Sequence, residues 1–182
     1  MKLIALFSTF LLSWFSGLVT PKTGGDPYTG CCGTKAVETT FGKTLIYVPN
    51  IFTPNADGLN DTFRPFYDEN ALKVTTFQVL TSEDKVLWEN KKFSPENPFD
   101  GWLGYVAKDS AYTGLFKYNM TFVDKAGATK AISGTACSVH CKQKEKINIT
   151  DKKQCFFPMQ YQKDSVNHYS PIFLEIDCLS GE

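Results

Sequence analysis

Residues 114–123 read Gly-Leu-Phe-Lys-Tyr-Asn-Met-Thr-Phe-Val, and this stretch decides the fold class. Large apolar side chains at alternate positions share one side of an extended chain, and mostly polar ones share the other. Residues 124–127 then form a polar turn that contains Gly127, and residues 131–139 follow as a second strand. The stretch therefore predicts an antiparallel pair of strands with one buried face.

Further short runs of apolar, aromatic or β-branched residues lie on both sides of this pair. They predict strands at residues 45–48, 74–80, 85–89, 147–149, 156–161 and 172–176. No segment repeats its apolar residues with the period of an α-helix, so little helix is expected. The 15 phenylalanines and 8 tyrosines suit a core built from strands. The sequence predicts an all-β chain with an antiparallel β-sandwich over residues 43–139.

Residues 1–20 have the order of an export signal. Lys2 precedes an apolar stretch over residues 3–19, and a polar, turn-forming run begins at Pro21. This order predicts a secretory signal peptide at residues 1–20, followed by a glycine- and proline-rich linker at residues 21–42. An uncleaved N-terminal anchor is the alternative, and it is the one route by which we expect membrane contact. The protein is therefore expected in the periplasm, the outer membrane or at the cell surface.

The cysteines all follow this export signal: Cys31, Cys32, Cys137, Cys141, Cys155 and Cys178. In an exported chain they predict disulfide bonds, and residues 140–182 are expected to form a cysteine-rich, disulfide-bonded extension. Spacing leaves the pairing open, although bridges from the first two cysteines to the last four would join the two ends of the chain. Zinc binding by the group around His140 is less well supported, because structural zinc sites use two closely spaced pairs of ligands.

The charge of the chain limits its classes of function. Lysine plus arginine and aspartate plus glutamate both number 19, so the net charge is zero. Nucleic acid is excluded as a partner, because its binding depends on a surplus of basic side chains. The sequence has 2 histidines, and it carries neither a nucleophile elbow nor a phosphate-binding glycine loop. We therefore expect a non-catalytic protein.

A second stretch, residues 48–65, carries the most specific pattern: Val-Pro-Asn-Ile-Phe-Thr-Pro-Asn-Ala-Asp-Gly-Leu-Asn-Asp-Thr-Phe-Arg-Pro. Asn55, Asp57 and Asp61 place side-chain oxygens close together along the chain, as a Ca²⁺ site requires. Arg64 stands where an EF-hand would supply its bidentate carboxylate, so the loop is not a complete EF-hand. Calcium is the one cofactor expected. The alternative is a turn in which these side chains bond the backbone of the loop itself.

Residues 48–63 resemble the signature of the gliding motility-associated C-terminal domain, the type B sorting domain of the type IX secretion system. The family reads roughly V-P-N-x-F-T-P-N-G-D-G-x-N-D-x-F, and among its fixed positions only Ala56 departs, standing where the family has glycine. Residues 99–102 (Phe-Asp-Gly-Trp) and residues 111–118 are similar to later family motifs. The resemblance spans residues 43–139, and the family's N-R-W-G turn is missing from it.

The resemblance implies an immunoglobulin-like sandwich, calcium at the three oxygen-bearing side chains, and a protein partner in the secretion, gliding or envelope machinery. A sorting domain of this family normally closes the chain with a short strand and a basic residue. Here residues 140–182 follow, and only the predicted linker precedes the match. We therefore expect this chain to share the family's fold but not necessarily its sorting role. This expectation favours an interaction module. A small adhesin-like, carbohydrate-binding protein of the surface or periplasm is the alternative, and a structural subunit of an envelope complex is a third possibility.

Overall fold

The computed structural model describes residues 28–97, 99–108, 110–141, 147–150, 152–162, 165–168 and 179–180. The predicted signal peptide at residues 1–20 lies outside this part of the chain, as do residues 21–27 of the predicted linker. Within the described part, no helix is both long enough and apolar enough to cross a membrane.

The larger sheet has five strands in the order β3-β10-β9-β5-β6. Their bounds are Ile51–Phe52 for β3, Leu72–Leu80 for β5, Val86–Asn90 for β6, Gly114–Asp124 for β9 and Thr129–Ser138 for β10. β3 pairs with β10 in parallel, and the other neighbours are antiparallel. The strands predicted at residues 74–80, 85–89, 114–123 and 131–139 are thus confirmed, with ends that differ by one or two residues.

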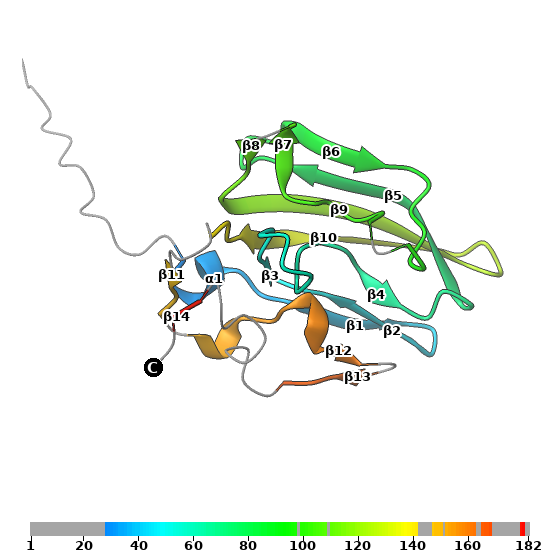
Figure 1. Ribbon diagram of the computed structural model, residues 1–182. Helices are drawn as coiled ribbons and strands as arrows, with labels where there is room; N and C mark the ends of the chain where they lie inside the picture. The colour runs from blue at the N-terminus through cyan, green and yellow to red at the C-terminus, as the bar shows by residue number, and fades with distance from the viewer. Residues whose placement is uncertain are drawn as a thin grey trace, which may run out of the picture.

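A three-stranded sheet, in the order β1-β2-β4, lies below the larger one in Figure 1. It consists of β1 (Val37–Phe41), β2 (Thr44–Val48) and β4 (Phe66–Tyr67). β2 matches the strand predicted at residues 45–48. β1 differs from prediction, because residues 37–41 were assigned to the linker and instead pair with β2 through a tight turn at Gly42, whose φ is 60°. That turn follows so closely on β1 that the two strands form a hairpin.

The remaining elements are short. They are α1 (Gly30–Gly33), β7 (Tyr105–Ala107), β8 (Ser110–Ala111), β11 (Ile147–Asn148), η1 (Lys152–Gln154), η2 (Pro158–Gln160), β12 (Tyr161–Gln162), β13 (Ser165–Val166) and β14 (Leu179–Ser180). The strand predicted at residues 156–161 is wrong: residues 158–160 form η2 instead. Pro158 suits the first position of a helical turn, and Phe157 N–H donates to Gln160 Oε1 at 2.6 Å. The strand predicted at residues 172–176 lies outside the described residues. The chain is all-β.

The two main sheets share one hydrophobic core. The alternation that predicted β9 is confirmed, because Phe116, Tyr118, Met120 and Phe122 are all at most 1% exposed. Tyr67 of β4 reaches across to Phe122 of β9, with ring centroids 5.4 Å apart in an edge-on contact. Such aromatic pairs stabilise a core beyond the area they bury.

A second buried cluster joins the two ends of the described chain. Its members are Cys31, Ile51, Cys137, Val139, Cys141, Ile149, Cys155 and Phe157. Two disulfides run through this region, Cys31–Cys155 and Cys32–Cys137, with Cα–Cα distances of 5.5 and 5.7 Å. Cys141 is disulfide-bonded as well, and Cys178 lies outside the described residues. The first two cysteines therefore pair with members of the last four, which is one of the arrangements that the sequence left open.

The turn α1 has an unusual backbone. Cys31 and Cys32 have φ of 55° and 59°, and the flanking Gly30 and Gly33 have φ of 54° and 70°. All four residues are thus left-handed, which costs an L-residue with a side chain roughly 1–2 kcal/mol each. Glycine tolerates the conformation at both ends, and the two bridged cysteines hold the centre against the rest of the fold.

Candidate functional site

The loop after β3 closes around the carboxylate of Asp61. Asp61 Oδ1 accepts hydrogen bonds from the backbone N–H groups of Asn55 and Ala56 at 3.0 and 2.6 Å. Its Oδ2 accepts one from the N–H of Gly58 at 2.8 Å. Three backbone donors of the loop thus converge on one side chain, so Asp61 sets the path of the backbone.

The other two predicted calcium ligands complete the same network. Asn55 Oδ1 accepts from the backbone N–H of Asp57 at 3.1 Å, and Asp57 Oδ1 accepts from that of Leu59 at 2.8 Å. Asn55 Nδ2 also donates to Asp57 Oδ2 at 2.8 Å. The structure therefore brings Asn55, Asp57 and Asp61 together in the arrangement that the Asx-turn alternative predicts.

A cation at this loop would compete with those backbone donors for the same oxygens. In the described ranges, no group of three or more histidine, cysteine, aspartate or glutamate side chains is arranged to hold a metal. Calcium at Asn55, Asp57 and Asp61 stays a prediction, and its ligand oxygens already accept hydrogen bonds from the loop backbone.

Ala56, which stands where the similar signature has glycine, lies at a sharp bend of the loop. Ala56 has a φ of 64°, in the left-handed region that glycine adopts without a steric penalty. Gly58, two residues on, has a φ of 90°, which a side chain would not tolerate well. The position where the family has glycine is therefore one where this loop bends in a way that glycine favours.

The segment around Trp102 packs under the loop. Trp102 and Phe63 exchange backbone hydrogen bonds of 2.9 Å in each direction. A Cβ on Gly101 would lie 2.6 Å from the carbonyl oxygen of Phe63, and one on Gly104 would lie 2.6 Å from Cγ of Pro54. These glycines are needed because the two segments approach so closely. Trp102 itself is 1% exposed, so it is not an aromatic platform for a sugar.

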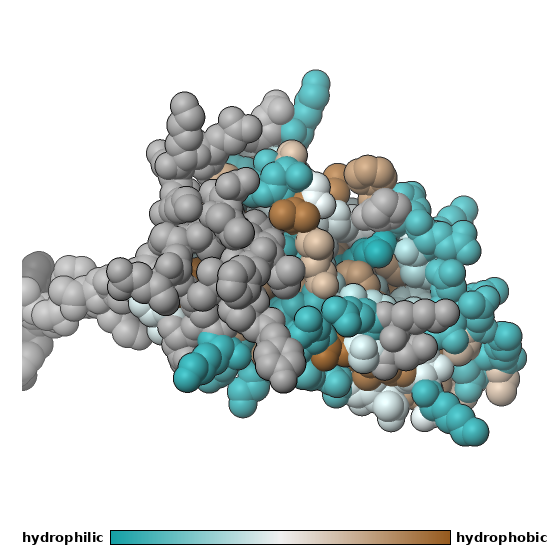
Figure 2. Space-filling view, turned by 60° about the horizontal axis from the view of Figure 1, so that its bottom comes forward, coloured by the Kyte–Doolittle hydropathy of each residue, from teal (hydrophilic) through white to brown (hydrophobic). Residues whose placement is uncertain are grey.

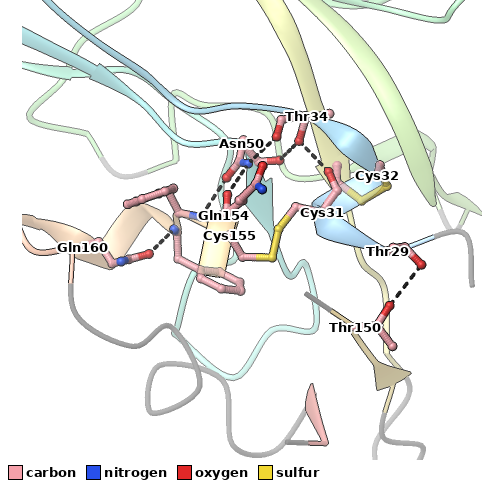
Figure 3. Close-up of a disulfide and its surroundings, with 12 residues drawn as sticks. Thr29, Cys31, Cys32, Thr34, Asn50, Thr150, Gln154, Cys155 and Gln160 are labelled. Atoms are coloured by element: carbon pink, nitrogen blue, oxygen red, sulfur yellow. Dashed lines mark hydrogen bonds between the residues drawn. A yellow bond between two sulfur atoms is a disulfide. The ribbon is translucent and has the colours of Figure 1, made fainter. Parts of the chain in front are cut away.

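Asn50 connects three parts of the chain that are distant in sequence (Figure 3). Its buried side chain donates from Nδ2 to the carbonyl oxygens of Thr34 and Gln154, at 3.1 and 2.8 Å. Its Oδ1 accepts from the backbone N–H of Phe156 at 2.7 Å. Asn50 lies at the corner between β2 and β3. Its amide thus bonds this corner to the N-terminal turn and to the C-terminal segment.

The C-terminal segment covers this side of the signature. Tyr47 donates from its hydroxyl to the carbonyl oxygen of Phe157 at 2.8 Å, and burial, with a smaller contribution from Glu38, raises the pKa of that phenol. The N–H of Met159 donates to Asn60 Oδ1 at 3.0 Å. Residues 154–159 therefore contact both ends of residues 48–65.

Sequence reasoning identified this stretch but missed the roles of Asn50 and Asn60 within it and of Tyr47 directly before it. The sequence marks Asn50 only as a polar residue between apolar neighbours, and that signal is too general to reveal its partners. No protein-family model matches the chain, and no curated protein or solved structure matches it either.

Proposed function

We propose that this chain is an exported, non-catalytic protein-interaction module linked to type IX secretion or gliding machinery. In this proposal the two packed sheets form an immunoglobulin-like sandwich, and residues 140–182 form its disulfide-bonded extension. The observation that carries the proposal is the loop at residues 53–61, in which Asp61 gathers three backbone donors and holds a signature-like sequence at the surface. A loop held by its own side chains is preorganised for binding a partner.

The contacts of the C-terminal segment favour an interaction module over a terminal sorting signal. Residues 154–159 satisfy the side chains of Asn50, Asn60 and Tyr47, so in this chain they cover part of the signature. Removing them would leave buried polar groups without partners and would expose the cluster around Phe157. The extension is therefore part of the fold, and the proposed role belongs to the whole chain.

The disulfides support the export half of the proposal. Cys31–Cys155 and Cys32–Cys137 each close more than 100 residues of chain, with sequence separations of 124 and 105. Bridges of this kind persist in oxidising compartments and are rare where glutathione keeps thiols reduced. Periplasm, outer membrane and cell surface all meet this condition.

The carbohydrate-binding alternative has less support. An exposed aromatic ring beside the loop would favour sugar binding, but Trp102 is buried there, and Trp88 packs edge-on against Phe77 with ring centroids 4.9 Å apart. We therefore propose the protein-interaction module alone and test it directly.

The test is site-specific photocrosslinking of the full chain in cells that carry this secretion machinery. A photoreactive amino acid replaces Leu59, which is 38% exposed on the loop, or Val86, which is 49% exposed on β6. We expect one discrete protein adduct from position 59 in the envelope fraction, and none from position 86. A chain retained in the cytoplasm, or equal adducts at the two positions, would overturn the proposal.

A further inference from the structure

A groove lies beside the signature loop, between it and the C-terminal segment. Its volume is about 560 Å³, and the residues that line it are Gly58, Asn60, Asp61, Thr62, Arg64, Phe66, Phe99, Pro158, Met159 and Tyr161. The groove therefore joins the loop to the segment that covers it, and both sides are held by the hydrogen bonds described above.

Large apolar side chains are exposed along this groove. Phe99 is 73% exposed and Met159 is 47% exposed. Leu59, next to the groove residue Gly58, is 38% exposed. Figure 2 shows hydrophobic side chains at the surface among hydrophilic ones on the face turned forward. Exposed apolar side chains that gather around a groove mark a binding site for another molecule.

Phe99 is held outward by a loop that is itself well bonded. Asp100 accepts hydrogen bonds from Ser94 N–H at 2.8 Å and from Asn97 Nδ2 at 2.7 Å. Phe99 N–H in turn donates to Asn97 Oδ1 at 3.1 Å. Because Asn97, Phe99 and Asp100 are already hydrogen-bonded, binding through the Phe99 ring would cost less conformational entropy than binding through a free loop.

Arg64 adds a positive charge to the same groove. Its Nη1 donates to the carbonyl oxygens of Pro95 at 3.1 Å and Asn97 at 3.5 Å, and its guanidinium lies 4.9 Å from the centre of the Phe66 ring. Among the described residues Arg64 forms no ion pair, although the charge of Glu69 acts on it from further away. A half-buried guanidinium bonded only to neutral carbonyls is suited to a carboxylate from outside.

The acidic residue that lines the groove does not form an ion pair with Arg64. Asp61 also lines the groove, but both of its oxygens accept hydrogen bonds from the loop backbone. Burial lowers the pKa of Arg64, and no ion pair among the described residues offsets that burial. The groove thus combines apolar walls with an uncompensated cation.

We propose that this groove binds an acidic–hydrophobic peptide segment of a partner protein. A large apolar side chain of the segment lies against Phe99 and Met159, and a neighbouring carboxylate bonds the guanidinium of Arg64. This inference rests on the proposed interaction role and adds the chemistry of the partner.

The test uses the purified, oxidised full chain and a displayed library of random short peptides. Selected peptides are expected to carry aspartate or glutamate beside phenylalanine, leucine or another large apolar residue. Replacing that acid with its amide in a synthetic peptide should weaken binding by about tenfold, as loss of a charge-assisted bond predicts, and it leaves the protein unchanged. Binding is measured by fluorescence polarisation.

Protein variants then locate the site. Phe99→Ala should weaken the same peptide by about tenfold, because an exposed aromatic anchor is lost. Leu115→Ala is the matched control, since Leu115 is 40% exposed on β9 and does not line the groove. Thermal unfolding of both variants should equal that of the parent, because each removes an exposed side chain.

Three results would overturn the inference: no peptide selected, selected peptides without acidic residues, or equal affinity for Phe99→Ala and the parent. Binding of a glycan in place of any peptide would overturn it as well. Peptide selection needs no secretion machinery, so its failure is distinguishable from failure of crosslinking at position 59.

Discussion

The side-chain amide of Asn50 donates to the main-chain carbonyl oxygen of Gln154 at 2.8 Å, across 104 residues of sequence. The same side chain accepts from Phe156 N–H, and Cys155 between them is bridged to Cys31. One polar residue and one disulfide therefore attach the C-terminal segment to the same corner of the fold. This attachment makes the extension testable as a structural part of the protein.

Replacing Asn50 should destabilise the whole chain. Asn50→Ala leaves Phe156 N–H and two carbonyl oxygens without their partner in a buried site, and we expect a loss of about 2–3 kcal/mol in the free energy of unfolding. Urea denaturation measures it. Asn119→Ala is the control, because Asn119 is exposed on β9 and should change stability little. An Asn50→Ala chain as stable as the control would contradict the proposed attachment.

The disulfide pairing predicts the number of free thiols in each variant. Two of the six cysteines remain after the bridges Cys31–Cys155 and Cys32–Cys137, so we predict that Cys141 pairs with Cys178. The wild type should then show no free thiol under denaturing, non-reducing conditions. Cys31→Ser should expose one, and the double variant Cys31→Ser, Cys155→Ser should again expose none.

Loss of that bridge should also lower stability. The double variant should unfold about 2–5 kcal/mol more easily than the wild type, as is usual for a native bridge in a small exported domain. A free thiol in the double variant would show that the cysteines pair differently.

Ala56→Gly should stabilise the protein. The φ of 64° at this position favours glycine, and removing the strained Cβ should add about 0.5–1 kcal/mol to the free energy of unfolding after the entropy of glycine is counted. Ala128→Gly is the matched control in the exposed turn before β10, where φ is not positive, and it should destabilise. If both substitutions raised the free energy of unfolding, or both lowered it, the loop geometry would be contradicted.

A calcium-binding role and a purely structural role of Asp61 predict different changes in stability when Asp61 is replaced. In calcium-free buffer, Asp61→Ala should cost about 1–3 kcal/mol, because three backbone N–H groups lose their acceptor. Asp57→Asn keeps an acceptor for Leu59 N–H and should cost less. Thermal unfolding with calcium and with chelator separates the two ideas.

A calcium site would raise the wild-type Tm with added calcium, and both substitutions would abolish that rise. An unchanged wild-type Tm would leave Asp61 with a structural role alone.

Buried tyrosines predict sensitivity to alkali. Burial raises the pKa values of Tyr47 and Tyr118 above the usual value for tyrosine, so the folded state favours their neutral forms. Their contribution to stability is complete below about pH 10, the pKa of an unfolded tyrosine, and is lost as the pH rises towards the folded values. Unfolding should therefore become easier above this pH.

Two phenylalanine variants separate the tyrosines. In the described part of the chain the Tyr118 hydroxyl has no hydrogen-bond partner, so Tyr118→Phe should preserve stability at neutral pH and reduce the alkaline loss. Tyr47→Phe should destabilise at neutral pH, because Phe157 loses a hydrogen-bond donor. The opposite order at neutral pH would contradict the assigned contacts.

Local patterns were enough to predict the main strands. β9 was predictable because burial of one face requires alternation, and the alternation lies within ten neighbouring residues of sequence. β1 was not, since its five residues bury no side chain fully and carry only a weak pattern. The segment at residues 156–161 was misassigned because its apolar side chains suit a strand, whereas Pro158 and Gln160 favour a helical turn.

The candidate site was likewise predictable only in its local part. Spacing along the chain was enough to predict that Asn55, Asp57 and Asp61 lie in one loop, because they are neighbours in sequence. Tertiary structure alone decided which cysteines pair and that Asn50 receives residues 154–156, because these contacts join parts of the chain more than 100 residues apart. A hydrogen bond or a disulfide depends on distance and direction in space, and those are set by how the sheets pack.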